Sequence, residues 1–259
     1  MKIVVLVKQV PDTEEERRLD PQTGILDREA GENVPDEIGE RALEVALQYK
    51  DADKDAEVVV LSMGPDTLLK SLRKMLSMGA DSAVHVLDDG LAGADAPRTA
   101  RVLAAALERI GFDLVVAGNE STDGRGGVVP AMVAEHLRLP LLPSLTSVEV
   151  RADGVRGDCA VDGGSLSLRA ALPAVVSVTE RAAEARFPNF KGIMKAKKKP
   201  LDTFSLAELG LAAGGPGEGA HCVVVSVEQR PARSAGRKVV DDGGAAVELV
   251  EFLVAGRLI

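Results

Sequence analysis

Residues 1–140 alternate between two hydrophobic patterns, and this alternation most constrains what the chain can fold into. Short continuous apolar runs, beginning with KIVVLV at 2–7, are typical of strands buried on both faces, whereas the segments between them repeat apolar residues at helical spacing. Asp95 is placed to cap the third helix, and Gly79 and Gly111 to end the second and third. The pattern predicts strands at 2–7, 56–64, 82–87 and 112–118 and helices at 37–50, 66–81, 95–111 and 126–139.

Strands that alternate with helices over short connections build right-handed βαβ units, which give a parallel sheet with helices on both faces. We therefore expect an α/β fold with a doubly wound, mostly parallel sheet. After residue 143 the pattern changes to strand-like segments joined by the turn sequences ADG and DGG, which predict added antiparallel strands. Further along, the residues predict a flexible Gly-rich insert at 211–220, one more strand at 221–229 and a closing helix at 245–259.

Ligands of such sheets bind beyond the carboxyl ends of the strands, where the strand order changes direction. The loops after Val7, Ser62 and Ala117 are therefore candidate binding loops. The third of these, AGNESTDGRGGVVP at 117–130, carries several glycines before a predicted helix, so backbone N–H groups and the helix N-terminus could approach a phosphate. It matches neither a Walker A loop nor GxGxxG in its usual place, and a tight strand-to-helix turn is the alternative interpretation.

The other two candidate regions are less distinctive. Lys8 and Asp12, in VKQVPDT at 7–13, either face a ligand at the change in strand order or belong to a polar loop. Asp36, in NVPDE at 33–37, is placed to cap the helix that follows it. Neither stretch predicts a binding site by itself.

Composition excludes several functional classes. The formal net charge of −9, from 40 acidic and 31 basic residues, is unsuited to general nucleic-acid binding. Cys159 and Cys222 lack metal-ligand spacing and the three His are scattered, so we expect no metal site. The N-terminal apolar run is short, Lys8 follows it at once, and no run reaches about 18 apolar residues. We therefore expect a soluble, cytoplasmic protein without direct membrane insertion.

Familiar catalytic motifs are missing as well. The sequence has no GxSxG, no HExxH and no Cys with a nearby His, and acidic pairs such as Asp241–Asp242 are typical of solvated surface. An enzyme built on this chain would have to take its chemistry from a cofactor. We therefore expect a protein without catalytic residues of its own.

The stretch ARFPNFKGIMKAKKKP, at 185–200, is unusual in a chain with five Phe, one Tyr and no Trp. It places Phe187 and Phe190 beside a run of Lys and Arg and is broken by Pro188, Gly192 and Pro200. From the residues alone, the rings either pack internally next to a solvated basic tail or form an exposed anchor for another protein.

Together these stretches resemble one family, the β subunit of electron transfer flavoprotein. The resemblance runs nearly end to end, and its most specific part is RFPNFKGIMKAKKKP. Cys159, in GDCAVDGG, departs from the family pattern, which usually has a basic residue shortly before this turn. The other matching stretches are VKQVPDT, SMGPDTLLKSLRKMLSMGAD, GNESTDGRGGVVPAMVAEHLRLP, LPAVVSVTE and RSAGRK.

The resemblance implies an adenine-nucleotide hydrolase-like α/β fold that pairs with a larger α subunit. The electron-carrying FAD would then sit mainly on the α subunit, and this chain would hold an AMP with a structural role. The positions that match the AMP contacts of the family are Leu6, Asn33, Val34, Pro35, Asp36, Met63, Gly118, Asn119, Glu120, Ser121, Thr122, Asp123, Gly124, Arg125, Gly126, Gly127, Val128 and Val129.

The resemblance also implies partners. Segment 185–200 would be a recognition loop that docks flavin dehydrogenases, such as the acyl-CoA dehydrogenases of fatty acid β-oxidation, before electrons pass to a quinone oxidoreductase. Residues 1–229 would form the nucleotide-binding domain, and 230–259 an arm that packs on the α subunit because it has little core of its own. The docking residues implied are Phe190 as the anchor, with Arg186, Lys191, Ile193, Met194 and Lys195 around it.

Two alternatives stay open. In a bifurcating flavoprotein the AMP site would hold a second FAD. A free-standing nucleotide-using enzyme of the same fold would need a phosphate-loop Lys, which 118–129 lacks.

Overall fold

The computed structural model describes residues 1–212, 222, 224–232 and 235–259. Its main sheet has nine strands in the order β11-β5-β4-β1-β6-β10-β7-β8-β9, and β2 and β3 form a separate antiparallel pair. The strands are β1 (Lys2–Leu6), β2 (Gln9–Pro11), β3 (Asn33–Pro35), β4 (Glu57–Met63), β5 (Ser82–Val86), β6 (Leu114–Gly118), β7 (Leu141–Arg151), β8 (Gly154–Val161), β9 (Gly164–Ala171), β10 (Ala174–Val178) and β11 (Leu201–Phe204).

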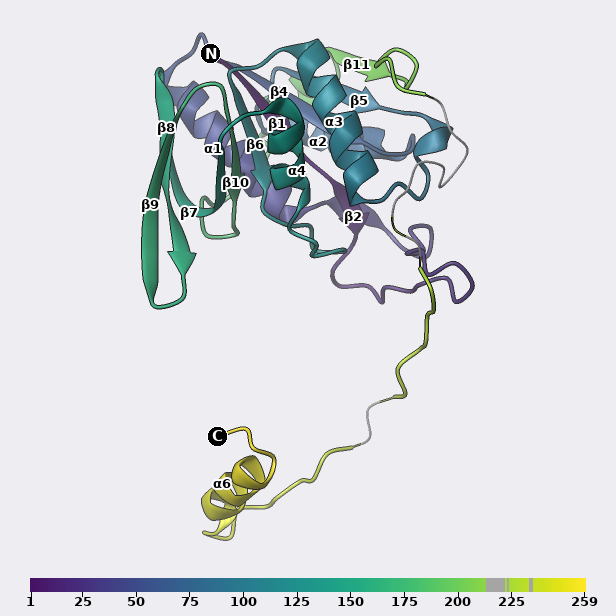
Figure 1. Ribbon diagram of the computed structural model, residues 1–259, viewed down its shortest axis with the longest axis vertical. Helices are drawn as coiled ribbons and strands as arrows, with labels where there is room; N and C mark the ends of the chain where they lie inside the picture. Colours follow the sequence, from purple (N-terminus) through teal and green to yellow (C-terminus); the bar gives the residue numbers. More distant parts are fainter. Residues whose placement is uncertain (213–221, 223, 233–234) are drawn as a thin grey trace.

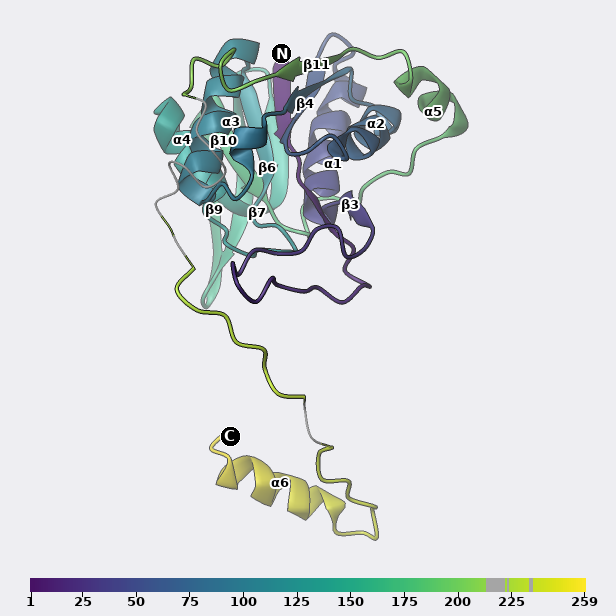
Figure 2. The ribbon, with the colours of Figure 1, turned by 90° about the vertical axis from the view of Figure 1, so that its right-hand side faces the viewer.

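Helices cover both faces of this sheet, as Figure 2 shows, with α1 and α2 on one side and α3 and α4 on the other. A short 3-10 helix, η1, precedes α3, and α5 lies beside α2 at the edge of the molecule. The helices are α1 (Glu37–Ala52), α2 (Leu68–Met78), η1 (Asp89–Leu91), α3 (Ala96–Ile110), α4 (Val129–Leu137), α5 (Phe190–Ala196) and α6 (Ala245–Ala255).

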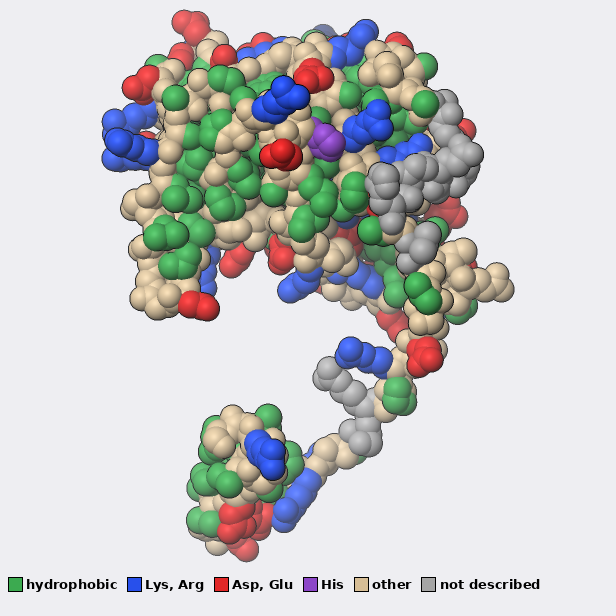
Figure 3. Space-filling view, viewed as in Figure 1, with side chains coloured by type: hydrophobic (Ala, Val, Ile, Leu, Met, Phe, Trp, Pro, Cys, Tyr) green, Lys and Arg blue, Asp and Glu red, His purple; other side chains and the backbone are tan. Residues whose placement is uncertain are grey.

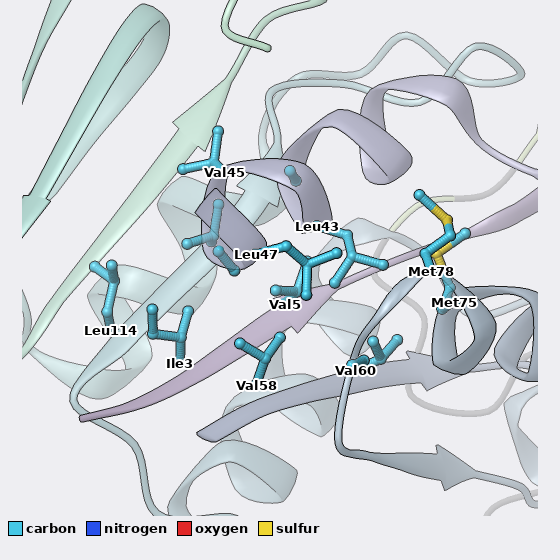
Figure 4. Close-up of a cluster of buried hydrophobic side chains, with 14 of the residues drawn as sticks. Ile3, Val5, Leu43, Val45, Leu47, Val58, Val60, Met75, Met78 and Leu114 are labelled. Atoms are coloured by element: carbon cyan, nitrogen blue, oxygen red, sulfur yellow. The ribbon is translucent and has the colours of Figure 1, made fainter. Parts of the chain in front are cut away.

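The two helical layers divide the core because successive side chains of a strand point to opposite faces. Ile3 and Val5 of β1 enter a cluster with α1 and α2, part of which is drawn in Figure 4. Val4 and Leu6 enter a second cluster with α3 and α4. The central strand β1 is thus buried on both sides, which explains its continuous apolar sequence.

The predicted alternation of strands and helices is confirmed along the first 140 residues. The seven strands from β11 to β7 are parallel to one another, whereas β8 and β9 are antiparallel additions beyond β7. Asp95 caps α3 by accepting a hydrogen bond from the backbone N–H of Arg98 at 2.9 Å, and Gly79 and Gly111 follow α2 and α3. Gly111 has φ +69°, a conformation that favours glycine.

The predictions for the second half need two corrections. The strand-like segments after residue 143 are not all antiparallel additions, because β10, within SLSLRAALPAVVSVTE at 165–180, is buried throughout and lies parallel between β6 and β7. The strand expected at 221–229 is wrong for the residues described there, Cys222 and 224–229, none of which is in a strand. Val225 is 92% exposed, and β11 instead occupies the sheet edge beside β5. His221, Val223 and most of the predicted 211–220 insert lie outside the described residues.

The predicted closing helix is confirmed as α6. It lies apart from the α/β body in both views (Figures 1 and 2), and none of its residues is buried. Its large apolar side chains are consequently exposed, among them Phe252 at 61% and Leu249 at 57%. Within the described ranges, no helix has the length and hydrophobicity that crossing a bilayer requires.

Candidate functional site

Three neighbouring strands carry the candidate binding loops to one edge of the sheet, the edge formed by the carboxyl ends of the parallel strands. Leu6 of β1 is paired with Leu61 of β4 on one side and Ala117 of β6 on the other. Strand β3 comes back to the same edge, where the N–H of Asp36 donates to the carbonyl of Lys8 at 2.8 Å. The predicted AMP-contact positions are therefore brought together at this edge, along which Figure 3 shows side chains of both charges.

Asp36 fastens the glycine-rich loop to the start of α1. Its side chain is 3% exposed, and Oδ1 accepts from the N–H of Ile38 at 3.0 Å, which confirms the predicted helix cap. Oδ2 accepts from both the N–H and the hydroxyl of Thr122, at 2.6 and 2.8 Å. Because both oxygens are occupied, Asp36 shapes the loop and its carboxylate is not free to bind a ligand.

Asp123 holds the same loop to two segments near the N-terminus. Its side chain is 1% exposed and pairs with Lys8 and Arg28, each at 2.8 Å. Burial opposes ionisation, but the hydrogen bonds from Lys8, Ser121 and Arg28 outweigh it and hold the pKa of the Asp123 carboxyl well below its usual range. Lys8 and Arg28 thus place two cations beside the loop, which favours an anionic ligand.

Segment 12–32 covers this edge and contributes a further contact. Arg17 donates through Nη1 to the carbonyl of Thr122 and through Nη2 to the carbonyl of Pro11 at 3.2 Å. Lys8, Arg17 and Arg28 are residues that the sequence pattern did not link to the glycine-rich loop. Lys8 also supplies a cation to a loop that has no Lys of its own.

The outer part of the glycine-rich loop offers hydrogen-bonding groups that the chain itself leaves unused. Arg125 to Val128 are exposed, and the N–H groups of Gly126, Gly127 and Val128 donate to no group among the described residues. The Oδ1 atom of Asn119 is buried and accepts no hydrogen bond in that same part of the chain. The unpaired N–H donors before α4 fit the phosphate of a ligand. The unpaired Asn119 acceptor fits a hydrogen-bond donor elsewhere on the same ligand.

The remaining predicted positions complete the surroundings of this loop. Leu6 is 8% exposed and packs with the α3 and α4 core, and Met63 is half-buried against the same cluster. A side chain at Gly118 would meet Ile38 at 2.9 Å, so this glycine allows β6 to lie close to α1. Gly127 has φ +64°, in the region that favours glycine.

The rings of segment 185–200 lie on the outside of the molecule. Phe187 is 93% and Phe190 80% exposed, and Ile193 and Met194 are about half exposed. The segment is not a loop throughout, because Phe190–Ala196 form α5, which Asn189 caps by accepting from the N–H of Gly192 at 2.8 Å. These exposures favour the anchor interpretation over internal packing.

The cations of this segment are not equivalent. Arg186 pairs with the buried Glu44 through Nε and Nη2, at 2.7 and 2.8 Å, and with Asp51 at 2.9 Å. The hydrogen bonds that Arg186 donates to Glu44 raise the pKa of the Arg186 guanidinium; burial opposes this shift and the contact with Asp51 adds to it. Lys199 donates to the carbonyls of Leu76 and Ala80. Arg186 and Lys199 are thus used within the molecule, whereas Lys191, Lys195, Lys197 and Lys198 are exposed.

The chain is similar to known proteins along its length. The electron transfer flavoprotein domain matches residues 23–209. "Electron transfer flavoprotein subunit beta" of Mycobacterium bovis is 48% identical over 263 residues, covering 99% of both chains, and that of Megasphaera elsdenii is 33% identical over 271 residues, covering all of both. "Caffeyl-CoA reductase-Etf complex subunit CarD" of Acetobacterium woodii is 32% identical over 213 residues, 82% of this chain and 81% of that one. The chain therefore belongs to the electron transfer flavoprotein family, whose beta subunits it matches along its length.

Proposed function

We propose that this beta subunit works in a heterodimer with an electron transfer flavoprotein α subunit. The heterodimer carries electrons from flavin dehydrogenases, such as acyl-CoA dehydrogenases, towards a quinone oxidoreductase in the cytoplasmic compartment. FAD, held mainly by the α subunit, supplies the redox chemistry when bound. This chain contributes no catalytic residue, and its part is to bind, orient and dock.

The edge described above is the proposed AMP site. The N–H groups of Gly126, Gly127 and Val128 would hold the phosphate, with the cations of Lys8 and Arg28 nearby. Asn119 would accept from an amino or hydroxyl group of the nucleotide through its unpaired Oδ1. Asp36 and Asp123 would keep the loop in shape. The unpaired groups of the glycine-rich loop are the observation that carries this assignment.

The remaining exposed surfaces are assigned to proteins. Phe190, with Lys191, Ile193, Met194 and Lys195, would contact the dehydrogenase, and Arg186 would fix the segment from behind. Residues 230–259, including the exposed α6, would pack on the α subunit. Both assignments place large exposed apolar side chains against a partner, where their burial is favourable.

A second candidate is a bifurcating flavoprotein, in which FAD takes the place of AMP in this chain. The resemblance to a subunit of a caffeyl-CoA reductase-Etf complex is the observation that favours it. Both candidates use the same phosphate-binding groups.

The experiment is to co-express the chain with α subunits from its own genome, purify the complex, release the nucleotides with acid and identify them chromatographically. AMP and one FAD per heterodimer supports the first candidate. Two FAD per heterodimer supports the second. No α subunit co-purifying, or no adenine nucleotide beyond the single FAD, contradicts the proposal.

A further inference from the structure

We propose that Gly192, Arg73 and Lys199 are positioning residues that fasten α5 to α2, so that segment 185–200 presents its rings in one preset orientation. This proposal rests on the docking role proposed above. Its new element is that docking depends on the residues that join the segment to α2, which do not themselves touch the partner. Figure 2 shows α5 lying alongside α2 at the edge of the molecule.

Gly192 brings the two helices into backbone contact. A Cβ placed at Gly192 would lie 2.3 Å from the carbonyl oxygen of Ser77, which is in the last turn of α2. Real side chains do not come this close to a backbone atom, and the Ser77 carbonyl could turn away only by distorting the last turn of α2. Any residue other than glycine therefore has to lift α5 away from α2.

The ends of the two helices are held by a reciprocal pair of cations. Arg73 of α2 donates through Nη1 to the carbonyls of Ala196 and Lys199, at 2.7 and 3.1 Å, where α5 ends. Lys199 donates in return to the carbonyls of Leu76 and Ala80, at 2.9 and 2.5 Å, where α2 ends. The last carbonyls of a helix have no partner within it, so each helix stabilises the end of the other.

The beginning of the segment is fastened separately, to α1. Arg186 makes the ion pairs with Glu44 and Asp51 described above, and its own N–H donates to Glu44 at 3.2 Å. Arg41 donates to the carbonyl of Ala183 at 2.6 Å. A helix of seven residues is not stable alone in water. Its helical form therefore derives from these attachments.

Fastening matters for docking because a rigid surface loses less conformational entropy on binding than a mobile one. The exposed rings and methionine would otherwise be ordered only when the dehydrogenase binds. Substitution of the residues that join the segment to α2 should therefore raise the Michaelis constant for the dehydrogenase reaction and leave the turnover number unchanged.

Gly192→Ala is the informative variant, because two effects predict opposite results. Alanine forms helices better than glycine, so an unattached α5 would become more ordered. The contact with Ser77 predicts a less ordered α5. Arg73→Met, which keeps an unbranched apolar stem and removes both hydrogen bonds to the end of α5, should act in the same direction. Gly164→Ala is the control, since a methyl group there meets nothing within 4 Å.

Each variant is purified as the flavin-loaded heterodimer and reduced by an acyl-CoA dehydrogenase, with Phe190→Ala as the reference. We expect KM for the heterodimer to rise about thirtyfold for Phe190→Ala and about tenfold for Gly192→Ala and Arg73→Met, with kcat unchanged. Hydrogen exchange of the α5 amides should accelerate in Gly192→Ala and Arg73→Met. Gly164→Ala should match the wild type in both measurements.

Two results would overturn the proposal and are distinguishable. If Phe190→Ala raises KM while Gly192→Ala and Arg73→Met stay within twofold of the wild type, α5 docks without being fastened. If Phe190→Ala itself leaves KM unchanged, the docking role is wrong. The present proposal is then wrong as well, whatever the hydrogen-exchange rates of the α5 amides are.

Discussion

Replacing Asp36 by alanine should destabilise the protein far more than the loss of an ordinary helix cap. The bond from Ile38 is such a cap, worth about 1 kcal/mol. The two bonds from Thr122 reach a buried carboxylate, and such bonds are worth about 1.5–3 kcal/mol each. The sum is about 4 kcal/mol at the low end, a large part of the 5–15 kcal/mol by which domains are typically stable.

The assay is urea unfolding of the purified protein, monitored by circular dichroism, for Asp36→Ala, Thr122→Val and the double variant. The coupling energy between the two side chains should be at least 1 kcal/mol, because Thr122→Val removes the hydroxyl bond alone. Nucleotide retention should fall as well, since the glycine-rich loop loses its attachment to α1. A loss of about 1 kcal/mol in Asp36→Ala, with no coupling to Thr122, would show that Asp36 is only a cap and would refute this reasoning.

Four further predictions follow from the same contacts. The pKa of Asp123 is depressed in the folded state, so the carboxylate stabilises the fold at neutral pH, and this contribution is lost as the pH falls below the unfolded-state pKa of about 3.9. The melting temperature of Asp123→Asn should therefore be below that of the wild type at pH 7. The difference between the two melting temperatures should narrow in acid. Gly127→Val forces a branched side chain into φ +64°, so acid extraction should release less nucleotide from the purified complex than from the wild type, and unchanged occupancy would contradict the assignment. Neutralising Lys197 and Lys198 should slow association with the dehydrogenase and flatten its salt dependence in stopped-flow measurements, with the melting temperature unchanged. A chain ending after Gln229 should fold, as judged by its circular dichroism, but fail to co-purify with the α subunit; a stable FAD-containing complex of the shortened chain would exclude the arm as the attachment.

The parts of the fold that sequence could predict are those whose residues interact with near neighbours in the chain. An apolar run such as KIVVLV is stable in a doubly wound sheet only as a strand that is buried on both faces. Asp95 marks a helix start through its own side chain, and Gly111 marks a helix end through its own backbone. The rule that ligands bind beyond the strand ends selected loops that do lie together in the structure, because the ends of adjacent parallel strands coincide whatever the loops contain.

The contacts that shape the site follow no periodic pattern. Lys8 and Asp123 are 115 positions apart and Arg28 and Asp123 are 95 apart, so only the folded chain shows that they pair. The resemblance implies a recognition loop at 185–200, whereas the structure forms α5 within it. Its helix α5 exists because α2 supports it, and Gly192, which disfavours a helix locally, is what permits that support.

The exposed helix α6 should affect how fast the chain is degraded in the cell. Val247, Leu249, Val250, Phe252 and Val254 are each more than half exposed, and Figure 3 shows green side chains on this helix. Proteases and chaperones act on exposed apolar segments of this kind. We expect copies that find no partner to be degraded from this end, so that turnover, and not only synthesis, would set the amount of the subunit that accumulates.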